Sequence, residues 1–331
     1  MVGMQGAQAG SRSFNGSRTA FAKSFSRRLK RGFWRITPLA WRQRAVVWMD
    51  RRAWLRQRPH LRFLLLGDLD EQDGEAYFRF VWSEHIGEAK EFESFTGFGG
   101  DGLLPTRHVL LADLTRFFEA RGLNPHRDVK TVLDLGCSRG SFLRFVERHV
   151  FENADELVGV DLDAQSIADG KAHVAEEASR VQLHCGDMTE VDGLLGGRRF
   201  DVILCTGALM YLTHPSAQKV VQWMCDHGTY VVMTDIAHPS VDNGSLPRSE
   251  RRWDRGYLHN LDEMARTAGA SVLYHRWEGD RAIDGFTIYF VFASRVGLPS
   301  LAALPGGPLL SGPRPGDELA QSRDRNERTG P

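Results

Sequence analysis

Several features typical of other protein classes are missing from this sequence of 331 residues. Its four Cys, at positions 137, 185, 205 and 225, form no CxxC pair, which argues against a disulfide scaffold or structural zinc and favours a reducing compartment. The twelve His include no HxxxH pair, so we expect no metal site. No run of eighteen apolar residues occurs, and the first thirty residues lack an apolar signal core. We therefore expect neither a membrane span nor a secretory signal.

The formal net charge is zero, because 42 Lys and Arg balance 42 Asp and Glu. The balance conceals an asymmetry: residues 1–63 contain fifteen basic residues against one acid, Asp50. We call this segment the basic arm. It holds four of the eight Trp, and a basic arm on an acidic body suggests an anionic partner.

Two helices are predicted in the basic arm, after a disordered start at residues 1–18. The first is a short basic amphipathic helix marked by apolar residues spaced four apart, Phe21, Phe25 and Leu29. The second has Thr37 as its N-cap and Pro38 as its first residue, and it extends to about Arg58.

Four interpretations of the basic arm are open. Its second helix could pack onto the body through Trp41, Trp48 and Leu55. The arm could instead lie on an anionic membrane, with Trp at the interface and Arg at the headgroups. It could bind nucleic acid, with Arg at phosphates and Trp stacked on bases. Residues 10–31, rich in Arg and Ser and free of acids, could also be a transit peptide.

Strand-like and helix-like segments alternate along the body, residues 64–295. Five apolar strands are predicted, at 131–135, 157–161, 181–185, 200–205 and 229–234. The alternation predicts an α/β fold with a doubly wound, mostly parallel sheet.

The end of the chain follows a different pattern. A short helix at 260–269 is followed by strands at 270–277 and 286–294, joined by a polar turn. This predicts a C-terminal antiparallel hairpin that completes a seven-stranded sheet. Residues 296–331 are rich in Pro, Gly and polar residues, so we expect a disordered tail.

Acids and glycines follow successive predicted strands. The first strand leads through Asp134 into a turn with Gly136 and Gly140 before a helix, and such glycines let the backbone approach a ligand closely. The second strand ends at Asp161, where a carboxylate can accept both hydroxyls of a ribose. The third is followed by Asp187, suited to an adenine amino group. Because these positions share one edge of the sheet, they predict a nucleoside site.

In these motifs the body, over about residues 105–295, resembles class I S-adenosylmethionine-dependent methyltransferases. Asp134, Gly136 and Gly140 match the family's D-x-G-x-x-x-G motif, with Ser138 in place of a frequent middle Gly. Asp161 matches its ribose-binding acid. The resemblance implies S-adenosylmethionine as cofactor, held by residues of four strand ends: Asp134, Leu135, Gly136, Cys137, Gly140, Asp161, Leu162, Gly186, Asp187, Met188, Thr206 and Gly207.

Other cofactor and substrate classes fit less well. The G-x-G-x-x-G spacing of nicotinamide-binding domains is missing, and Asp134 would be a poor neighbour for a pyrophosphate. The fourth strand leads into Cys205-Thr206-Gly207-Ala208, unlike the [DN]-P-P-[YF] motif of enzymes that methylate base amines in DNA. No Cys follows a Pro, so the motif of cytosine C5 enzymes is missing too.

Methylation of a hydroxyl benefits from a general base. The candidates follow the fourth and fifth strands, Tyr211, His214, Asp235 and His238, with His238 preferred. Each could equally be a surface or capping residue. The polar segment 239–258 could be a lid over the acceptor, or a solvated loop; residues 82–95, with His85 and Lys90, could cap the cofactor.

The sequence therefore predicts a cytoplasmic methyltransferase that acts on an oxygen of a small-molecule, lipid-linked or glycan acceptor. The arm could attach it peripherally to the inner face of a membrane. One alternative is a tRNA or RNA methyltransferase that uses the basic arm. Another is a degenerate domain that binds the cofactor without turnover and serves as an interaction module.

Overall fold

The fold is described from a computed structural model of the chain. It describes residues 37–52, 74–87, 103–252, 256–283 and 286–304, and the single positions 66, 67, 69 and 89. The chain separates into two compact units, Met1–Tyr77 and Phe78–Pro331. The predicted first helix of the arm and the end of the predicted tail lie outside the described residues.

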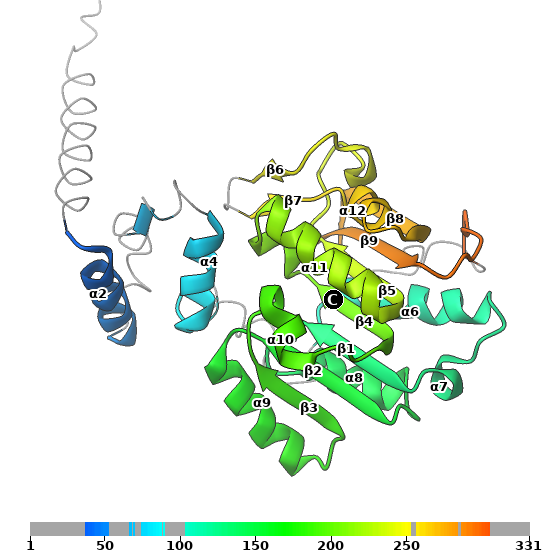
Figure 1. Cartoon of the computed structure of the whole chain (residues 1–331), viewed down its shortest axis with the longest axis horizontal. Coiled ribbons are helices and arrows are strands. Elements are labelled where there is room, and N and C mark those ends of the chain that lie inside the picture. The colour runs from blue at the N-terminus through cyan, green and yellow to red at the C-terminus, as the bar shows by residue number, and fades with distance from the viewer. Residues whose placement is uncertain are drawn as a thin grey trace, which may run out of the picture. The chain divides into compact units, whose positions relative to one another are not determined.

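A seven-stranded sheet forms the centre of the second unit (Figure 1). Its strand order is β3-β2-β1-β4-β5-β9-β8. The first five strands of the chain pair in parallel, whereas β9 is antiparallel to both β5 and β8. The mostly parallel sheet with a C-terminal antiparallel hairpin is thus confirmed. The strands of the sheet are β1 Thr131–Leu135, β2 Glu156–Asp161, β3 Val181–Cys185, β4 Phe200–Thr206, β5 Gly228–Asp235, β8 Ser271–Ile283 and β9 Phe286–Ser294.

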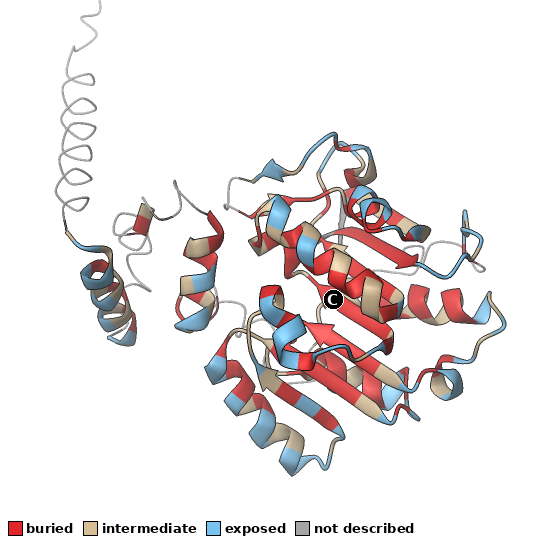
Figure 2. Cartoon of the chain, viewed as in Figure 1, coloured by how far each residue is buried: buried red, intermediate tan, exposed pale blue. Residues whose placement is uncertain are grey.

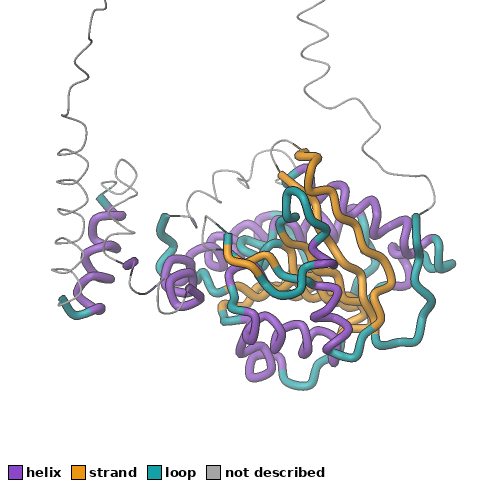
Figure 3. The backbone as a smooth tube through the Cα atoms, turned by 90° about the horizontal axis from the view of Figure 1, so that it is seen from above, coloured by secondary structure: helices purple, strands orange, loops and turns teal. Residues whose placement is uncertain are grey.

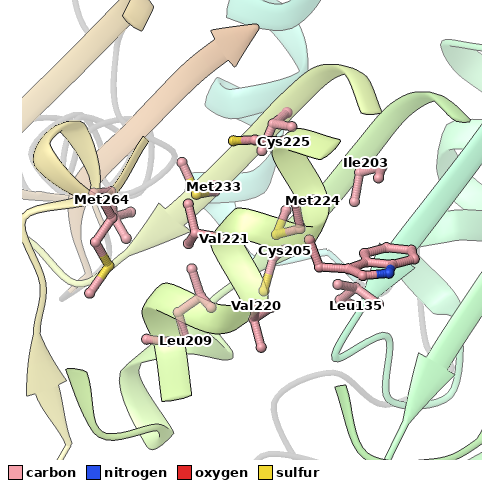
Figure 4. Close-up of a cluster of buried hydrophobic side chains, with 14 of the residues drawn as sticks. Leu135, Ile203, Cys205, Leu209, Val220, Val221, Met224, Cys225, Met233 and Met264 are labelled. Carbon is pink, nitrogen blue, oxygen red and sulfur yellow. The ribbon is translucent and has the colours of Figure 1, made fainter. Parts of the chain in front are cut away.

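The helices of the second unit cover both faces of the sheet, as the view from above shows (Figure 3). On one face α10, α11 and α12 bury side chains against the strands. Figure 4 shows Val220, Val221 and Met224 of this layer in one cluster with Ile203 and Leu135 of the sheet. On the other face α6, α8 and α9 do the same. The helices have the bounds α6 Pro105–Glu119, α7 Pro125–Asp128, α8 Ser141–His149, α9 Ala164–Glu176, α10 Val191–Leu195, α11 His214–His227 and α12 Leu261–Thr267.

The central strands are buried on both sides (Figure 2). Val132 and Leu133, neighbours in β1, are both fully buried, one against each helical layer. This explains why the parallel strands have continuous apolar sequences rather than alternating ones. Asn260 is the N-cap of α12 and accepts a hydrogen bond from the backbone N–H of Glu263 at 2.9 Å.

Two predictions for the C-terminal region need correction. The segment 278–285, expected to be a turn, belongs largely to β8, which continues to Ile283. The tail, expected to be disordered from residue 296, lies on the body up to residue 304. Its Leu304 is buried, and the backbone N–H of Leu301 donates to the carbonyl of Leu273 at 2.7 Å. Apolar side chains spaced three apart thus anchor this part of the tail.

Between β5 and α12 the chain forms a 3-10 turn, η3 Asn243–Ser245, and a small hairpin of β6 Glu250–Arg251 and β7 Tyr257–Leu258. Another 3-10 turn, η2 Leu209–Tyr211, follows β4. The predicted lid segment 239–258 is therefore structured at both its ends, and β7 lies next to η2.

The first unit contains the helix α2 Leu39–Arg51. It begins one residue later than predicted, with Pro38 at the N-cap position and no side-chain cap. Its buried face is Arg42, Val46 and Asp50, whereas Trp41 and Trp48 are 69% and 47% exposed. No helix among the described residues is both long and apolar enough to cross a membrane.

Candidate active site

The carboxyl ends of β1, β2, β3, β4 and β5 meet at one edge of the sheet because these strands are parallel. The turn after β1 is anchored there by Gly136 and Cys137, whose backbone N–H groups donate to the carbonyl of Val160 at 2.8 and 3.1 Å. Gly136 has a φ of 79°, and a Cβ at this position would lie 2.4 Å from the Cβ of Ala208. Glycine is therefore required where the ends of β1 and β4 approach each other.

Asp161, at the end of β2, is hydrogen-bonded to the same turn. Its Oδ2 accepts from the backbone N–H of Ser138 at 2.7 Å, and its Oδ1 accepts from that of Asp163 at 2.9 Å. Burial raises the pKa of Asp161 to about 6, although these backbone donors oppose the rise. Each oxygen keeps acceptor capacity for a further donor, which suits a vicinal diol.

Asp134, in β1, is 1% exposed, and neither of its carboxylate oxygens has a hydrogen-bond partner among the described residues. Burial raises the pKa of Asp134 to about 7, against the opposing charge of Arg107. A buried carboxylate without donors is costly unless a ligand supplies them. The site is therefore suited to a cationic or hydrogen-bond-donating group.

The end of β3 places Asp187 and Met188 at the same edge. Asp187 accepts from the backbone N–H and the hydroxyl of Thr189 through Oδ1, at 2.9 and 2.8 Å. Its Oδ2 forms an ion pair with Arg79. The methyl group of Met188 would lie 3.6 Å from a Cβ at position 136, so this side chain borders the turn after β1.

The end of β4 supplies another polar atom without a partner. Thr206 Oγ1 is buried and has no hydrogen-bond partner among the described residues. The following Gly207 has a φ of 73°, and its backbone N–H donates to the carbonyl of Thr234 at 2.9 Å. The structure thus brings all the predicted cofactor residues to one edge, although their contacts with a cofactor remain a prediction.

Three charged or polar contacts at this edge were not predicted from the sequence. Arg107, in the first turn of α6, donates to the carbonyl of Thr206 at 3.4 Å and faces Asp134 electrostatically. Burial lowers the pKa of Arg107. Arg79 pairs with Asp187, and the ring of His85 lies 2.5 Å from a carboxylate oxygen of Asp163. No motif marks Arg79 or Arg107, because only the tertiary fold brings helical arginines to a strand end.

Side chains of α4 Gly74–Ser83 lie beside the turn after β4. The ring of Phe78 is 4.8 Å from that of Tyr211, and the ring of Trp82 is 5.2 Å from it. The predicted cap is described at residues 82–87 and 89; Lys90 lies outside the described residues. These contacts place the segment beside Tyr211 and beside Asp163, whose backbone N–H donates to the predicted cofactor residue Asp161.

Of the predicted bases, His238 is engaged within its own loop. Its Nδ1 accepts from the backbone N–H groups of Ser240 and Val241 at 3.2 and 3.0 Å. A neutral ring with Nδ1 as acceptor carries its proton on Nε2 and is a donor there. This arrangement favours a loop-shaping role over the role of a base.

Asp235 and His214 have different surroundings. Asp235, at the end of β5, is buried; the backbone N–H groups of Ile236 and Met210 lie near its carboxylate, but none of the described residues gives it a hydrogen bond of good geometry. Burial raises the pKa of Asp235 well above its ordinary value, and the charge of Arg252 opposes the rise. His214 is exposed at the start of α11, with Nδ1 2.9 Å from the hydroxyl of Ser249. Among the described residues, no group of three or more His, Cys, Asp or Glu could hold a metal ion.

Comparison with known proteins finds a methyltransferase domain within this unit. Residues 132–228 match the family described as "Methyltransferase domain", and this range includes all the predicted cofactor residues. No curated protein matches the sequence at a significant level.

Solved structures of methyltransferases have a similar fold. One is a magnesium protoporphyrin IX methyltransferase from Synechocystis PCC 6803 with bound SAH, at 14% identity and a TM-score of 0.49, covering 67% of this chain and 100% of that chain. Another is CalS10, an amino pentose methyltransferase from Micromonospora echinaspora, at 20% identity and a TM-score of 0.40, covering 57% of this chain and 91% of that chain.

The sheet order and the strand-end site define a Rossmann-like, cofactor-binding α/β domain. The match over residues 132–228 identifies this part of the chain as a methyltransferase domain of the class I type, which uses S-adenosylmethionine as its cofactor. The residues present fit this cofactor, because a buried carboxylate without donors, Asp134, accompanies a second, Asp161, with acceptor capacity for a ribose.

Proposed function

We propose that the chain transfers a methyl group to an oxygen of a small-molecule, lipid-linked or glycan acceptor. One observation carries the proposal. Buried polar atoms to which the described residues give no hydrogen bond of good geometry lie at three neighbouring strand ends: both carboxylate oxygens of Asp134, Thr206 Oγ1 and both carboxylate oxygens of Asp235. Burying such atoms unpaired is unfavourable, so their grouping favours a ligand that supplies donors across the whole edge.

Four residues would each hold a different part of the cofactor. Asp161 would accept from the ribose hydroxyls, Asp187 from the adenine amino group and Asp134 from the amino-acid end. Met188 would pack on the adenine ring. Bound S-adenosylmethionine supplies an electrophilic methyl group on a sulfonium, and holding it beside the acceptor accounts for much of the rate by making the reaction unimolecular.

Asp235 and His214 belong to the acceptor side in this proposal. The Asp235 carboxyl would bind or orient a hydroxyl, since β5 ends next to β4, where Thr206 stands. Tyr211 would border the acceptor, and His214 would take up the proton of its hydroxyl. An oxygen acceptor is favoured because these groups pair naturally with a hydroxyl hydrogen.

Calorimetric titration of the full chain with S-adenosylmethionine, S-adenosylhomocysteine and NADH tests the cofactor site. We expect micromolar binding of the two sulfur compounds and none of NADH. Release of S-adenosylhomocysteine is then measured with a panel of phenols, sugars, polyprenyl-linked sugars and tRNA. Turnover with a hydroxyl compound supports the proposal. Turnover with tRNA alone, or binding without turnover on any of the panel, would replace it with the RNA-modifying or the non-catalytic alternative.

A peripheral membrane location is a second proposal, supported by the exposed face of α2. Trp41, Arg44, Trp48 and Arg51 repeat at three- and four-residue spacing and are all exposed. The guanidinium of Arg52 also lies 4.0 Å from the centre of the Trp48 ring. Such a basic aromatic face suits anionic headgroups, each nearby basic residue contributing about 1 kcal/mol.

Sedimentation with vesicles tests this location. We expect the full chain to sediment with vesicles containing one third phosphatidylserine, and not with pure phosphatidylcholine. The double variant Trp41→Ala/Trp48→Ala should lose most of the binding, whereas Gln43→Ala on the same helix should not. The membrane proposal is ruled out if the full chain does not sediment with the anionic vesicles, or if it binds tRNA and no vesicle.

A further inference from the structure

A chain of hydrogen bonds closes the base of the β6–β7 hairpin. Ser249 immediately precedes β6 and His259 immediately follows β7, and the Ser249 hydroxyl lies 2.8 Å from His259 Nδ1. His259 Nε2 lies 3.1 Å from the carbonyl of Leu209, in η2. On the other side, the Ser249 hydroxyl lies 2.9 Å from His214 Nδ1. Four residues from three separate segments thus form one continuous chain.

The direction of each hydrogen bond follows from the carbonyl at its end. A carbonyl oxygen only accepts, so His259 Nε2 must carry a proton. His259 is fully buried, and burial lowers its pKa to about 4, so the ring is neutral near pH 7 and its Nδ1 is an acceptor. Ser249 must therefore donate its hydroxyl proton to His259.

The same reasoning extends to His214. Because the Ser249 proton is directed at His259, the Ser249 oxygen is left to accept, and His214 Nδ1 must be the donor. A neutral imidazole with its proton on Nδ1 has its lone pair on Nε2. The exposed ring of His214 thus presents an acceptor nitrogen, whereas the neutral ring of His238 presents a donor at Nε2.

We propose that Ser249 and His259 are positioning residues that hold His214 in the tautomer with a free Nε2, so that His214 accepts the proton of the acceptor hydroxyl. The inference rests on the proposed function. His214 is the first residue of α11 and follows β4 closely, at the carboxyl edge that carries the candidate site. The rings of Tyr257 and His259 stack, with centroids 5.8 Å apart, which fixes the plane of the buried imidazole.

The proton and charge balance is simple. The acceptor O–H bond breaks, its proton passes to His214 Nε2, and the oxygen forms its new bond to the methyl carbon. The electrons of the broken carbon–sulfur bond stay with sulfur, which changes from a cation to a neutral thioether while His214 becomes an imidazolium. Because His214 is exposed, the imidazolium returns its proton to water.

Nitrogen-15 NMR of the histidine rings in the full chain tests this arrangement without an acceptor. Near pH 8 we expect His259 as the Nε2–H tautomer and His214 as the Nδ1–H tautomer. Ser249→Ala removes the hydroxyl that orients His214, so its signals should shift toward the Nε2–H form. Ser249→Thr keeps a hydroxyl at the same position and should restore the Nδ1–H form. An Nε2–H tautomer of His214 in the unaltered chain, or one unaffected by Ser249→Ala, would overturn the proposal.

Two further measurements separate this inference from the proposed function. His214→Gln and Ser249→Ala should bind S-adenosylhomocysteine within about twofold of the unaltered chain, because neither residue is placed at the cofactor. If the unaltered chain binds no sulfur cofactor, the proposed function fails. The NMR measurement of the His214 and His259 tautomers still tests the hydrogen-bonded arrangement of the rings in that case. With a hydroxyl acceptor that turns over, His214→Gln should lower kcat about 100-fold with little change in KM. An unchanged kcat would overturn the role of His214.

Discussion

Arg79 forms an ion pair with Asp187, the acid expected to accept the adenine amino group. The pair joins α4 to the end of β3, and it engages the one carboxylate oxygen of Asp187 that does not bind Thr189. Arg79 and the adenine amino group would thus share this oxygen, and the ion pair lowers its strength as an acceptor for the adenine.

Replacing Arg79 should therefore tighten cofactor binding slightly. The Arg79 side chain is 43% exposed, and partly exposed pairs contribute about 0.2–1 kcal/mol. We expect Arg79→Ala to lower the Kd of S-adenosylhomocysteine by roughly 1.5- to 5-fold, with a smaller salt dependence. Arg127→Ala, which breaks an exposed pair with Asp128, is the control. Weaker binding by Arg79→Ala in calorimetry would mean that Arg79 itself contacts the ligand.

Asp161 is expected to hold the ribose. Asp161→Ala should weaken S-adenosylhomocysteine binding by at least roughly 10- to 150-fold, since even one lost hydrogen bond to a charged group is worth about 1.5–3 kcal/mol. Asp155→Ala is a matched control, because Asp155 is exposed just before the opposite end of β2. Circular dichroism checks that the turn bonded by Asp161 stays folded. A folded Asp161→Ala variant with unchanged affinity would contradict the ribose assignment.

Asp134 should make the ligand-free chain less stable at high pH. Its pKa rises from 3.8 to about 7 on folding, so the folded chain binds a proton more tightly than the unfolded chain. The contribution of Asp134 to the free energy of unfolding falls as the pH rises from about 3.8 to about 7, and it stays unfavourable above that. Asp134→Asn should thus be more stable than the unaltered chain by roughly 2–4 kcal/mol at pH 8.5, with little difference at pH 4. Denaturant unfolding of both chains at pH 8.5 and pH 4 measures this difference in the free energy of unfolding. An equal difference at the two pH values would refute the raised pKa of Asp134.

His275 should also make the chain less stable as the pH rises, although here the charged form of the ring is the stabilising one. Its ring lies 3.0 Å from a carboxylate oxygen of Asp262 and 3.0 Å from one of Asp242, and so joins α12 to the segment after β5. Burial lowers its pKa, but the bonds and charges of the two carboxylates outweigh burial and raise it overall. The stabilisation is complete below about pH 6.5 and is lost as the pH rises through the higher folded-state pKa.

His275→Gln should therefore lose roughly 1–3 kcal/mol of stability at pH 6 and less at pH 9. His173→Gln, whose partners Glu176 and Glu177 lie on the surface of α9, should change stability by less than about 1 kcal/mol at either pH. Thermal unfolding at the two pH values compares the variants. A pH-independent loss at His275 would show that its packing matters and its charge does not.

The order and type of the main elements could be predicted because each has a strong local signal. β1 was predicted with its observed ends, since a buried apolar run stands between charged residues and a glycine turn. The cofactor residues were brought to one edge for a topological reason, because parallel strands place their carboxyl ends together. The end of β8 differs from the prediction because residues 278–281 are polar or Gly and have no apolar strand signal, although Glu278 and Ile283 on either side of a register shift pair with β9.

The acceptor side of the site was harder to predict. Ser249 and His259 are ten residues apart, and nothing local indicates that they meet; only the β6–β7 pairing brings them together. His238 was preferred because it closely follows β5, yet the two backbone donors at its Nδ1 depend on the path of the loop. The interaction of Arg107 with Asp134 likewise depends on how α6 crosses the sheet.

The lateral strand β8 is the last in its sheet, and such a strand offers unpaired backbone groups to other chains. Residues just beyond β9 occupy some of these groups: the Ser300 hydroxyl donates to the carbonyl of Val272 at 2.6 Å, and the Leu301 N–H donates to that of Leu273. The nine residues 296–304 therefore cover part of the exposed edge of β8 and hinder edge-to-edge aggregation. A chain shortened to end at residue 295 would keep every strand but expose this edge, and its solubility would fall before its activity did.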